Sequence, residues 1–172
     1  MARLPYVEKE SSNPEQEKIL NQLTQKSGKI ANIWKLWSHS PLTLETFMPF
    51  YKTLMKGTLD GRLRELAYIK TSVVNDCPYC AEGHKRVARK IGITEEQLEA
   101  INSYQSSTLF TPVEKLVLRY AEELTKTVKS SNDLIEELKK HLTEEQLIEL
   151  NLTVGTANLT YRFNMSFMTD MD

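Results

Sequence analysis

The chain has 172 residues, 40% of them apolar and 26% charged, so it is long enough for one domain with a hydrophobic core. Its 22 lysines and arginines balance 23 aspartates and glutamates, which argues against a nucleic-acid partner, because phosphate backbones attract proteins with surplus positive charge. No stretch approaches the roughly 20 apolar residues that span a bilayer, and the N-terminal MARLPYVEKE has no signal-peptide core. We therefore expect a cytoplasmic protein with no membrane partner.

Helix signals begin near the N-terminus. Asn13 is a good N-cap with proline at the next position, and Gly28 is suited to a helix end, so a helix is predicted between them. In IANIWKLWSHSP, apolar residues spaced by three and four predict a second helix. Its Trp34 and Trp37 are expected to lie in the core or at a subunit contact rather than at a substrate platform.

Two further helices are predicted ahead of the only cysteines. The stretch LTLETFMPFYKTLMKG has helical apolar spacing, with Pro49 expected to kink the helix and Gly57 to end it. After Gly61, RLRELAYIKTSVVND places its apolar residues on one helical face. That helix leads directly into the cysteine pair.

Capping boxes mark three more helix starts, at Thr94, Thr111 and Thr143. The similar stretches TEEQLEAIN and TEEQLIELN either record an internal duplication or reflect convergence on the same capping signal. The last helix is predicted from Glu144 towards Met168, and its apolar sequence should be buried in the core or against another subunit. No strand pattern and no linker interrupts the chain, so we predict an all-α fold with a single domain over residues 1–172.

Both cysteines lie in NDCPYCAEGHK. Pro78 suits the first helical position, which makes Cys77 the expected N-cap and places Cys80 in the first turn. A helix N-terminus stabilises a thiolate, and residues three apart in a helical turn are close enough to form a disulfide. In a reducing cytosol such a pair is typical of redox catalysis or metal binding rather than of a structural disulfide.

A proton acceptor is available for these thiols. His84 follows Cys80 by four residues, so it shares the same helical face and can exchange a proton with the sulfur. If the two helices form an antiparallel hairpin, Glu65 lies about one helical turn from the position opposite His84, roughly 5 to 6 Å away, and one water could bridge the gap. Zinc binding is the alternative, although Cys77, Cys80, His84 and Glu65 fall short of four nitrogen or sulfur ligands. Haem attachment needs a histidine directly after the second cysteine, where Ala81 stands.

Glu65, the pair in CPYC and His84 together resemble the core motif of the alkylhydroperoxidase D-like and carboxymuconolactone decarboxylase superfamily. The likeness centres on residues 60–92 and extends to the flanking stretches SPLTLETFMPFYKTLMKGTLDG and TPVEKLVLRYAEEL. It implies an all-helical fold in trimers, hexamers or dimers. In the peroxidase branch, the glutamate acts through a water and with the histidine activates the second cysteine, which attacks the peroxide, and the first cysteine then forms a disulfide with it. The resemblance gives these roles to Glu65, His84, Cys80 and Cys77.

One position departs from the best-studied peroxidase of that family, which has a second histidine where this chain has Tyr79. Tyrosine titrates near pH 10 and cannot shuttle protons near neutrality, although it could still act as an auxiliary group. The decarboxylase branch typically lacks the cysteine pair, which argues against that activity.

These observations predict a cytoplasmic, homo-oligomeric thiol peroxidase or disulfide reductase that reduces an organic peroxide, needs no cofactor or metal, and takes electrons from a thioredoxin-like or lipoyl-type donor. The alternatives are a non-catalytic oligomer that senses redox state or scaffolds a partner, and a carboxymuconolactone decarboxylase-like enzyme. His39 and His141 are expected at the surface. Arg162 is expected either to form a buried salt bridge or to reach the site.

Overall fold

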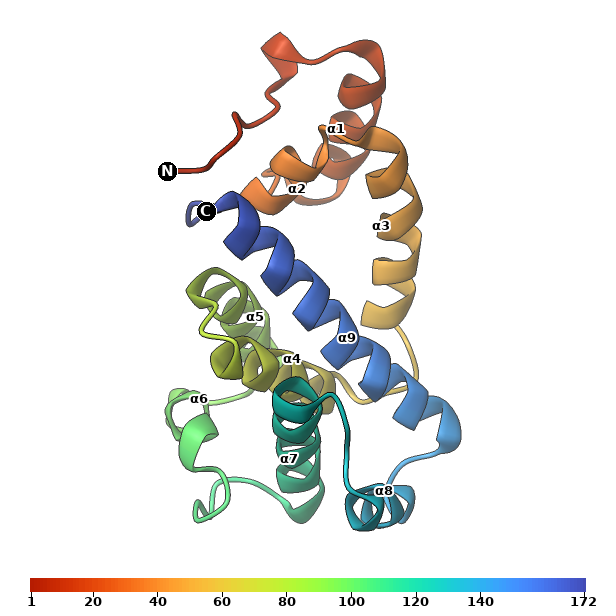
Figure 1. The fold of residues 1–172 in the computed structure, drawn as a ribbon, viewed down its shortest axis with the longest axis vertical. Coiled ribbons are helices and arrows are strands. Elements are labelled where there is room, and N and C mark those ends of the chain that lie inside the picture. Colours follow the sequence, from red (N-terminus) through yellow and green to blue (C-terminus); the bar gives the residue numbers. More distant parts are fainter. The chain divides into compact units, whose positions relative to one another are not determined.

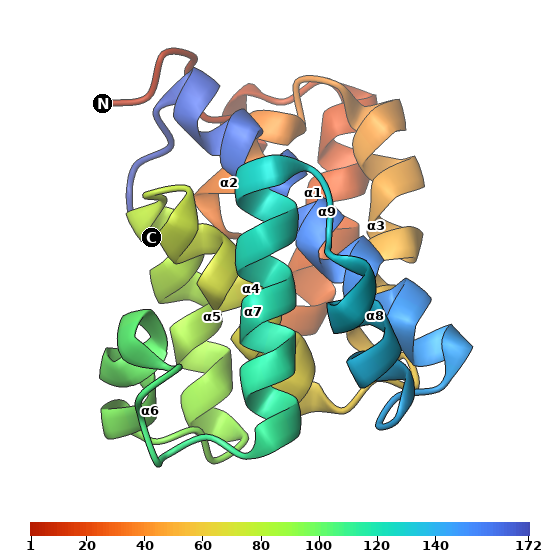
Figure 2. The same cartoon turned by 60° about the horizontal axis from the view of Figure 1, so that its bottom comes forward.

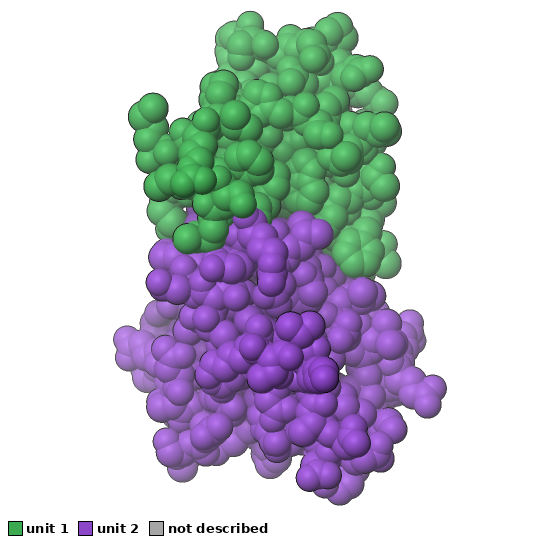
Figure 3. Space-filling model, in the orientation of Figure 1, with its two compact units in different colours: residues 1–53, 163–172 green, residues 54–162 purple. Residues whose placement is uncertain are grey.

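The structure is a computed structural model that describes the backbone of all 172 residues and every side chain except those of residues 25–27. Its secondary structure is helical throughout the described chain, with no strand, which confirms the predicted all-α class (Figure 1). The chain divides into two compact units, one formed by Met1–Thr53 with Phe163–Asp172 and the other by Leu54–Arg162 (Figure 3). The assignment of residues 1–172 to one domain stays a prediction.

The first unit contains the N-terminal helices. Its elements are η1 (Lys9–Ser11), α1 (Pro14–Ser27), α2 (Asn32–Trp37), most of α3 (Pro41–Met55), and the final residues of α9 (Glu144–Phe167). Asn13 is the N-cap of α1, as predicted, and it forms a full capping box with Gln16. Helix α3 continues through Pro49. Ile19, Leu23, Leu44 and Met48 form the buried core of this unit.

Aromatic rings gather against that core. Trp37 stacks on Phe47 with ring centroids 4.7 Å apart and on Phe163 at 5.0 Å. Trp34 contacts Trp37 at 6.1 Å and meets Tyr51 edge-on at 5.6 Å. The prediction that both tryptophans belong to a packed cluster is therefore confirmed.

The two ends of the chain meet within this unit. Asp170 binds the N-terminal ammonium of Met1 at 3.0 Å, accepts from the Ala2 amide at 3.1 Å, and accepts from the Tyr6 hydroxyl at 3.0 Å. The hydrogen bond from the ammonium, followed by those from the amide and the hydroxyl, holds the pKa of Asp170 below its ordinary value. The C-terminal tail is thus fastened by one ionised carboxylate.

The second unit is built around α4. Its elements are α4 (Gly61–Val74), α5 (Pro78–Lys90), α6 (Glu95–Glu99), η2 (Ala100–Ser103), α7 (Pro112–Thr127), α8 (Asn132–Lys139) and α9 as far as Arg162. The capping boxes predicted at Thr94, Thr111 and Thr143 are all present. In Figure 2, α4 lies behind α7, with α5 and α6 on one side and α8 on the other. Most side chains of α4 are buried, because α5 and α7 both pack against it.

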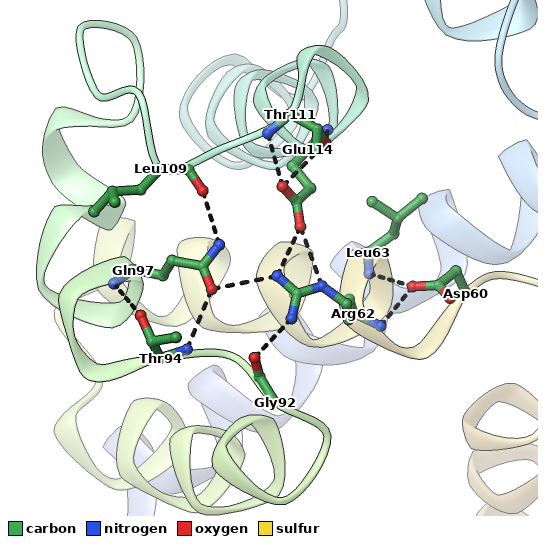
Figure 4. A network of polar contacts seen from close by, with 9 residues as sticks. All are labelled: Asp60, Arg62, Leu63, Gly92, Thr94, Gln97, Leu109, Thr111 and Glu114. Atoms are coloured by element: carbon green, nitrogen blue, oxygen red, sulfur yellow. Dashed lines mark hydrogen bonds and ion pairs between the residues drawn. The ribbon is translucent and has the colours of Figure 1, made fainter.

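Arg62 fixes the beginning of α4 to its neighbours (Figure 4). Its guanidinium donates to Glu114 of α7 at 3.0 Å, to the Gly92 carbonyl at 2.9 Å, and to Gln97 of α6 at 3.3 Å. Asp60 caps the same helix by accepting from the Arg62 and Leu63 amides. The first turn of α4 is therefore held from several directions by charged hydrogen bonds, which are stronger than neutral ones.

A second contact fixes the loop before α4. Glu149 of α9 accepts from the Thr58 amide at 3.0 Å, from the Thr58 hydroxyl at 3.2 Å, and from the Leu59 amide at 2.6 Å. A Cβ at Gly57 would overlap with this carboxylate. Glycine is favoured here, because a Cβ would displace the carboxylate from the three hydrogen bonds that it accepts.

The last helix buries one face and exposes another. Leu150, Val154 and Ala157 are fully buried, whereas Ile148 is 62% exposed, Leu152 38% and Leu159 45%. The predicted burial of α9 in the core is therefore confirmed for one face. The opposite apolar face is open in the single chain.

Candidate active site

The predicted site lies on the hairpin of α4 and α5. After α4, the chain turns at Asp76, whose φ of 53° lies in the left-handed region that aspartate tolerates better than most residues. The Cys77 amide then donates to the Ser72 carbonyl at 2.9 Å and closes the turn. Cys77 is the N-cap of α5 and Pro78 its first residue, as the sequence predicted.

The cysteine pair is closed as an intramolecular disulfide between Cys77 and Cys80. Their Cα atoms are 5.4 Å apart, within the predicted span. The Cys77 sulfur accepts a hydrogen bond from the Cys80 amide at 3.3 Å, so it takes the place of a capping oxygen. In the reduced protein the same N–H and the helix dipole would stabilise a Cys77 thiolate. Both residues are buried, Cys77 being 2% exposed and Cys80 5%.

Glu65 and His84 are in direct contact. His84 Nδ1 lies 2.7 Å from Glu65 Oε2, so the expected bridging water between them is wrong. The His84 ring stacks on the ring of Tyr68, with centroids 3.4 Å apart and planes 14° from parallel. Tyr68 follows Glu65 by three residues on the same face of α4, so the two residues contact His84 from adjacent positions on that face.

The Glu65 carboxylate is enclosed. It is 1% exposed, and its other oxygen lies 3.6 Å from Arg64 Nε. With Glu65 ionised, Nδ1 of His84 carries the hydrogen and donates it, which leaves Nε2 as the basic ring nitrogen. The hydrogen bond to an ionised Glu65 would therefore fix the tautomer of His84 as well as its orientation.

Tyr68 is a residue of the site that sequence reasoning missed. Its hydroxyl shares a 2.6 Å hydrogen bond with Thr160 Oγ1 of α9, which anchors the ring on which His84 stacks. The signal in the sequence is an aromatic residue three positions after Glu65, on the face that a hairpin partner must cover. That spacing is equally typical of an ordinary core residue.

The other predicted residues fall in different places. Tyr79 is half-buried in the first turn of α5. Arg162 is exposed and donates to the Asn158 carbonyl at 3.0 Å and to Asn158 Oδ1 at 3.3 Å, so both predictions for it, a buried salt bridge and direct contact with the site, are wrong. The Asn158 side chain also accepts from Asn75, two residues before Cys77, at 3.0 Å. His39 and His141 are exposed, as predicted.

A buried ion pair occupies another part of the second unit. Lys70 lies 3.4 Å from Glu122 and over the ring of Tyr104. Burial lowers the pKa of Lys70, while the Glu122 carboxylate opposes that shift. Tyr104 donates to the same carboxylate at 3.1 Å, so these groups satisfy one another within the packing of α4, η2 and α7.

Among the described residues, no group of three or more His, Cys, Asp and Glu side chains is arranged to hold a metal ion. No described helix is long and apolar enough to cross a membrane. The candidate site consists of the Cys77–Cys80 pair, His84 and Glu65.

Comparison with known proteins identifies related sequences and folds. Residues 41–123 match the carboxymuconolactone decarboxylase family model. The uncharacterized protein YdfG of Bacillus subtilis is 26% identical over 129 residues, covering 74% of this chain and 88% of its own length. YnjA of Escherichia coli, also uncharacterized, is 27% identical over 141 residues, covering 80% of this chain and 77% of its own length.

Solved structures share the fold at lower identity. An uncharacterized peroxidase-related protein with an alkylhydroperoxidase AhpD core, from Ralstonia eutropha, superposes with a TM-score of 0.85 at 21% identity, covering 99% of this chain and 92% of its own. The debrominase Bmp8 in complex with 2,3,4-tribromopyrrole superposes with a TM-score of 0.82 at 16% identity, covering 100% of this chain and 94% of its own. These superpositions confirm the predicted AhpD-like helical fold.

Proposed function

We propose that this chain, whose residues 41–123 match the carboxymuconolactone decarboxylase family model and whose fold is AhpD-like, is a thiol-dependent peroxidase or disulfide reductase. The observation that carries the proposal is the direct Glu65–His84 contact on the hairpin that also holds the Cys77–Cys80 disulfide. A redox pair, a base and a group that orients the base are the three components that thiol activation requires. We place the protein in the cytosol, where thiol donors keep such a pair reduced.

Proton transfer to His84 begins the proposed cycle. The Cys80 thiol gives its proton to Nε2 of His84, while Glu65 holds Nδ1–H and stabilises the imidazolium. The Cys80 thiolate attacks one peroxide oxygen, the O–O bond breaks, and the alkoxide takes the proton from His84 to leave as an alcohol. Cys80 is then a sulfenic acid.

Cys77 completes the oxidative half of the proposed catalytic cycle. Its sulfur attacks the Cys80 sulfenic sulfur, the S–O bond breaks, and the Cys77 proton and the hydroxyl leave as water. The product is the disulfide that the structure contains. A dithiol donor of the thioredoxin-like or lipoyl type then restores both thiols by exchange and becomes a disulfide itself.

We assign peroxide attack to Cys80 rather than Cys77. Cys80 precedes His84 by one helical turn and so lies on its face, whereas Cys77 is the N-cap, outside the helix. Tyr79 lies between the two cysteines in the sequence and cannot transfer protons near neutral pH. The proton path therefore depends on one histidine, with Tyr79 as an auxiliary hydrogen-bonding group.

The debrominase Bmp8, whose fold matches this chain over its whole length, suggests a second class of substrate. A dithiol that becomes a disulfide delivers two electrons and two protons. These can replace a bromine on a pyrrole ring by hydrogen, with release of bromide and a proton, or reduce a peroxide to an alcohol and water. We propose halogenated pyrroles as the alternative substrate class. Peroxide is the preferred substrate class because Glu65, the CPYC pair and His84 resemble the motif of the peroxidase branch.

Steady-state turnover tests the proposal. We expect cumene hydroperoxide to be consumed catalytically with a thioredoxin-like or dihydrolipoyl donor, and 2,3,4-tribromopyrrole to serve as the comparison substrate. Cys80→Ser should abolish a single turnover, whereas Cys77→Ser should react once and accumulate a sulfenic acid that dimedone traps. One oxidation without turnover with any donor would instead identify a redox sensor or scaffold. Turnover of a muconolactone by both serine variants would identify a decarboxylase-like enzyme.

We further propose that the chain forms a homo-oligomer. Ile148, Leu152 and Leu159 recur at intervals of four and seven residues on one face of α9, and all three are exposed in the single chain. Apolar faces of this kind are typical of symmetric interfaces between identical subunits. Whether the assembly is a dimer, a trimer or a hexamer is a question for light scattering.

A further inference from the structure

Two hollows open in the first unit, and they differ in charge. One has a volume of about 230 Å³ and is bordered by Glu15, Lys18 and Glu45 among its lining residues. The other has a volume of about 280 Å³, lies among α1, α2 and α3, and is lined by Leu23, Lys29, Ile30, Trp34, Met48 and Lys52, among others. Both hollows belong to the same compact unit.

The smaller hollow has a net negative charge from its own residues. Lys18 binds Glu45 at 2.9 Å, and Glu15 adds a second negative charge. The larger hollow has two lysines, and none of its described lining residues carries a carboxylate. Both lysines have interactions within the protein, so an incoming anion would add to or replace a contact at the rim. The local charge favours an anion at the larger hollow.

The apolar part of the larger hollow is rigidly built. Leu23 and Met48 belong to the buried core of the unit. The Trp34 ring packs against Phe47 with centroids 6.1 Å apart and against Tyr51 at 5.6 Å, which fixes its position. A fixed indole beside a methionine thioether offers an aromatic ligand both ring packing and a sulfur contact.

We propose that the larger hollow binds a small planar aromatic carboxylate. The ring would lie against Trp34 and Met48, and the carboxylate would bind Lys52 and Lys29. Pockets for drug-sized ligands measure roughly 300 to 1,000 Å³, so about 280 Å³ suits a ligand of one or two fused rings. This site does not depend on the thiol chemistry, and it uses none of the residues assigned to it.

Calorimetric titration of the full chain with 2-naphthoate tests the proposal, with uncharged 2-naphthamide as the matched ligand. We expect 2-naphthoate to saturate with a Kd of about 1 mM or lower, as for a ligand of this size with ordinary efficiency. Lys52→Gln and Lys29→Gln should each weaken binding about two- to fivefold, the range for exposed ion pairs. Lys18→Gln is the control and should leave binding unchanged, because Lys18 borders the other hollow.

The location is checked by the indole N–H signals of the two tryptophans. Trp37 donates its indole N–H to Thr43 at 2.9 Å and serves as the internal reference, so naphthoate should shift the Trp34 signal more than the Trp37 signal. Equal affinity for naphthamide, an equal effect of Lys18→Gln, an unshifted Trp34 signal, or no saturation by 5 mM ligand would each overturn the proposal. Because peroxide turnover is not measured, failure here leaves the thiol function untouched.

Discussion

Replacing Glu65 with glutamine separates catalysis from stability at the proposed site. The carboxylate is 1% exposed and touches His84 at 2.7 Å and Arg64 at 3.6 Å. Glutamine keeps the shape of the side chain but removes its charge. Loss of a hydrogen bond to a charged group costs about 1.5–3 kcal/mol, so the free energy of unfolding should fall by that amount.

The rate should fall for a different reason. Without the charge of Glu65, His84 loses the group that fixes its tautomer and stabilises its imidazolium. General acid–base groups contribute roughly 10²- to 10⁴-fold, so single-turnover peroxide reduction at pH 7 should slow by about tenfold or more. His84→Gln should slow it comparably, and the double variant should be little slower than either single variant, because the two residues act as one unit.

The chain provides a matched control in Glu114→Gln. Glu114 is also a buried carboxylate, 4% exposed, and it binds Arg62 at 3.0 Å. Urea unfolding should show a similar loss of stability for both variants, whereas the rate per folded molecule should fall only for Glu65→Gln. If the Glu65 variant were merely less stable, or if both variants slowed equally, the relay would be refuted and Glu65 would be a structural ion-pair partner.

Three other predictions follow from the packing. Gly57→Ala should lower the free energy of unfolding by about 1–3 kcal/mol in urea, because a Cβ there collides with Glu149; Gly83→Ala, with open space around it, should not. The carboxyl ¹³C titration of Asp170 should have its midpoint below 3.8, the ordinary value, because its partners favour the ionised form. The contribution of Asp170 to stability is therefore complete above pH 3.8 and lost as the pH falls below it. A midpoint at or above 3.8 would contradict the contacts of Asp170 with Met1, Ala2 and Tyr6. Leu159→Glu should shift light scattering towards monomer, whereas a wild-type monomer at micromolar concentration would exclude the proposed oligomer.

Features set by a few neighbouring residues could be predicted from the sequence. Thr94, Thr111 and Thr143 each form the expected capping box, because the reciprocal bonds involve only residues three apart. Cys77 at the N-cap and Cys80 in the first turn follow from Pro78 in the same way. Family resemblance added what spacing alone cannot supply, namely the roles of the four site residues.

The direct Glu65–His84 contact could not be predicted, because it depends on the register between two helices. That register is set where Asp76 takes a left-handed conformation and where the Cys77 amide binds Ser72. The helical spacing placed Glu65 about one turn from the position opposite His84, and the structure shows direct contact instead. The stack of His84 on Tyr68 is a further tertiary contact that no local sequence pattern predicts. The expectation for Arg162 failed for a different reason, since its partner Asn158 lies four residues earlier on the same helix.

The two helices of the hairpin differ in how firmly they are held, and this difference matches their parts in the proposed cycle. α4 carries Glu65 one turn after Arg62, whose guanidinium is fixed to three neighbouring segments. α5 carries the disulfide in its first turn, where the Cys77 sulfur accepts from the Cys80 amide. A donor dithiol must attack one sulfur in line with the S–S bond, and both cysteines are buried at 2% and 5% exposure. Reduction therefore requires that turn to open locally, and the first turn of a helix is among the segments that open at the lowest free energy. The carboxylate on α4 keeps its place while this happens, so the relay is ready when the thiols form.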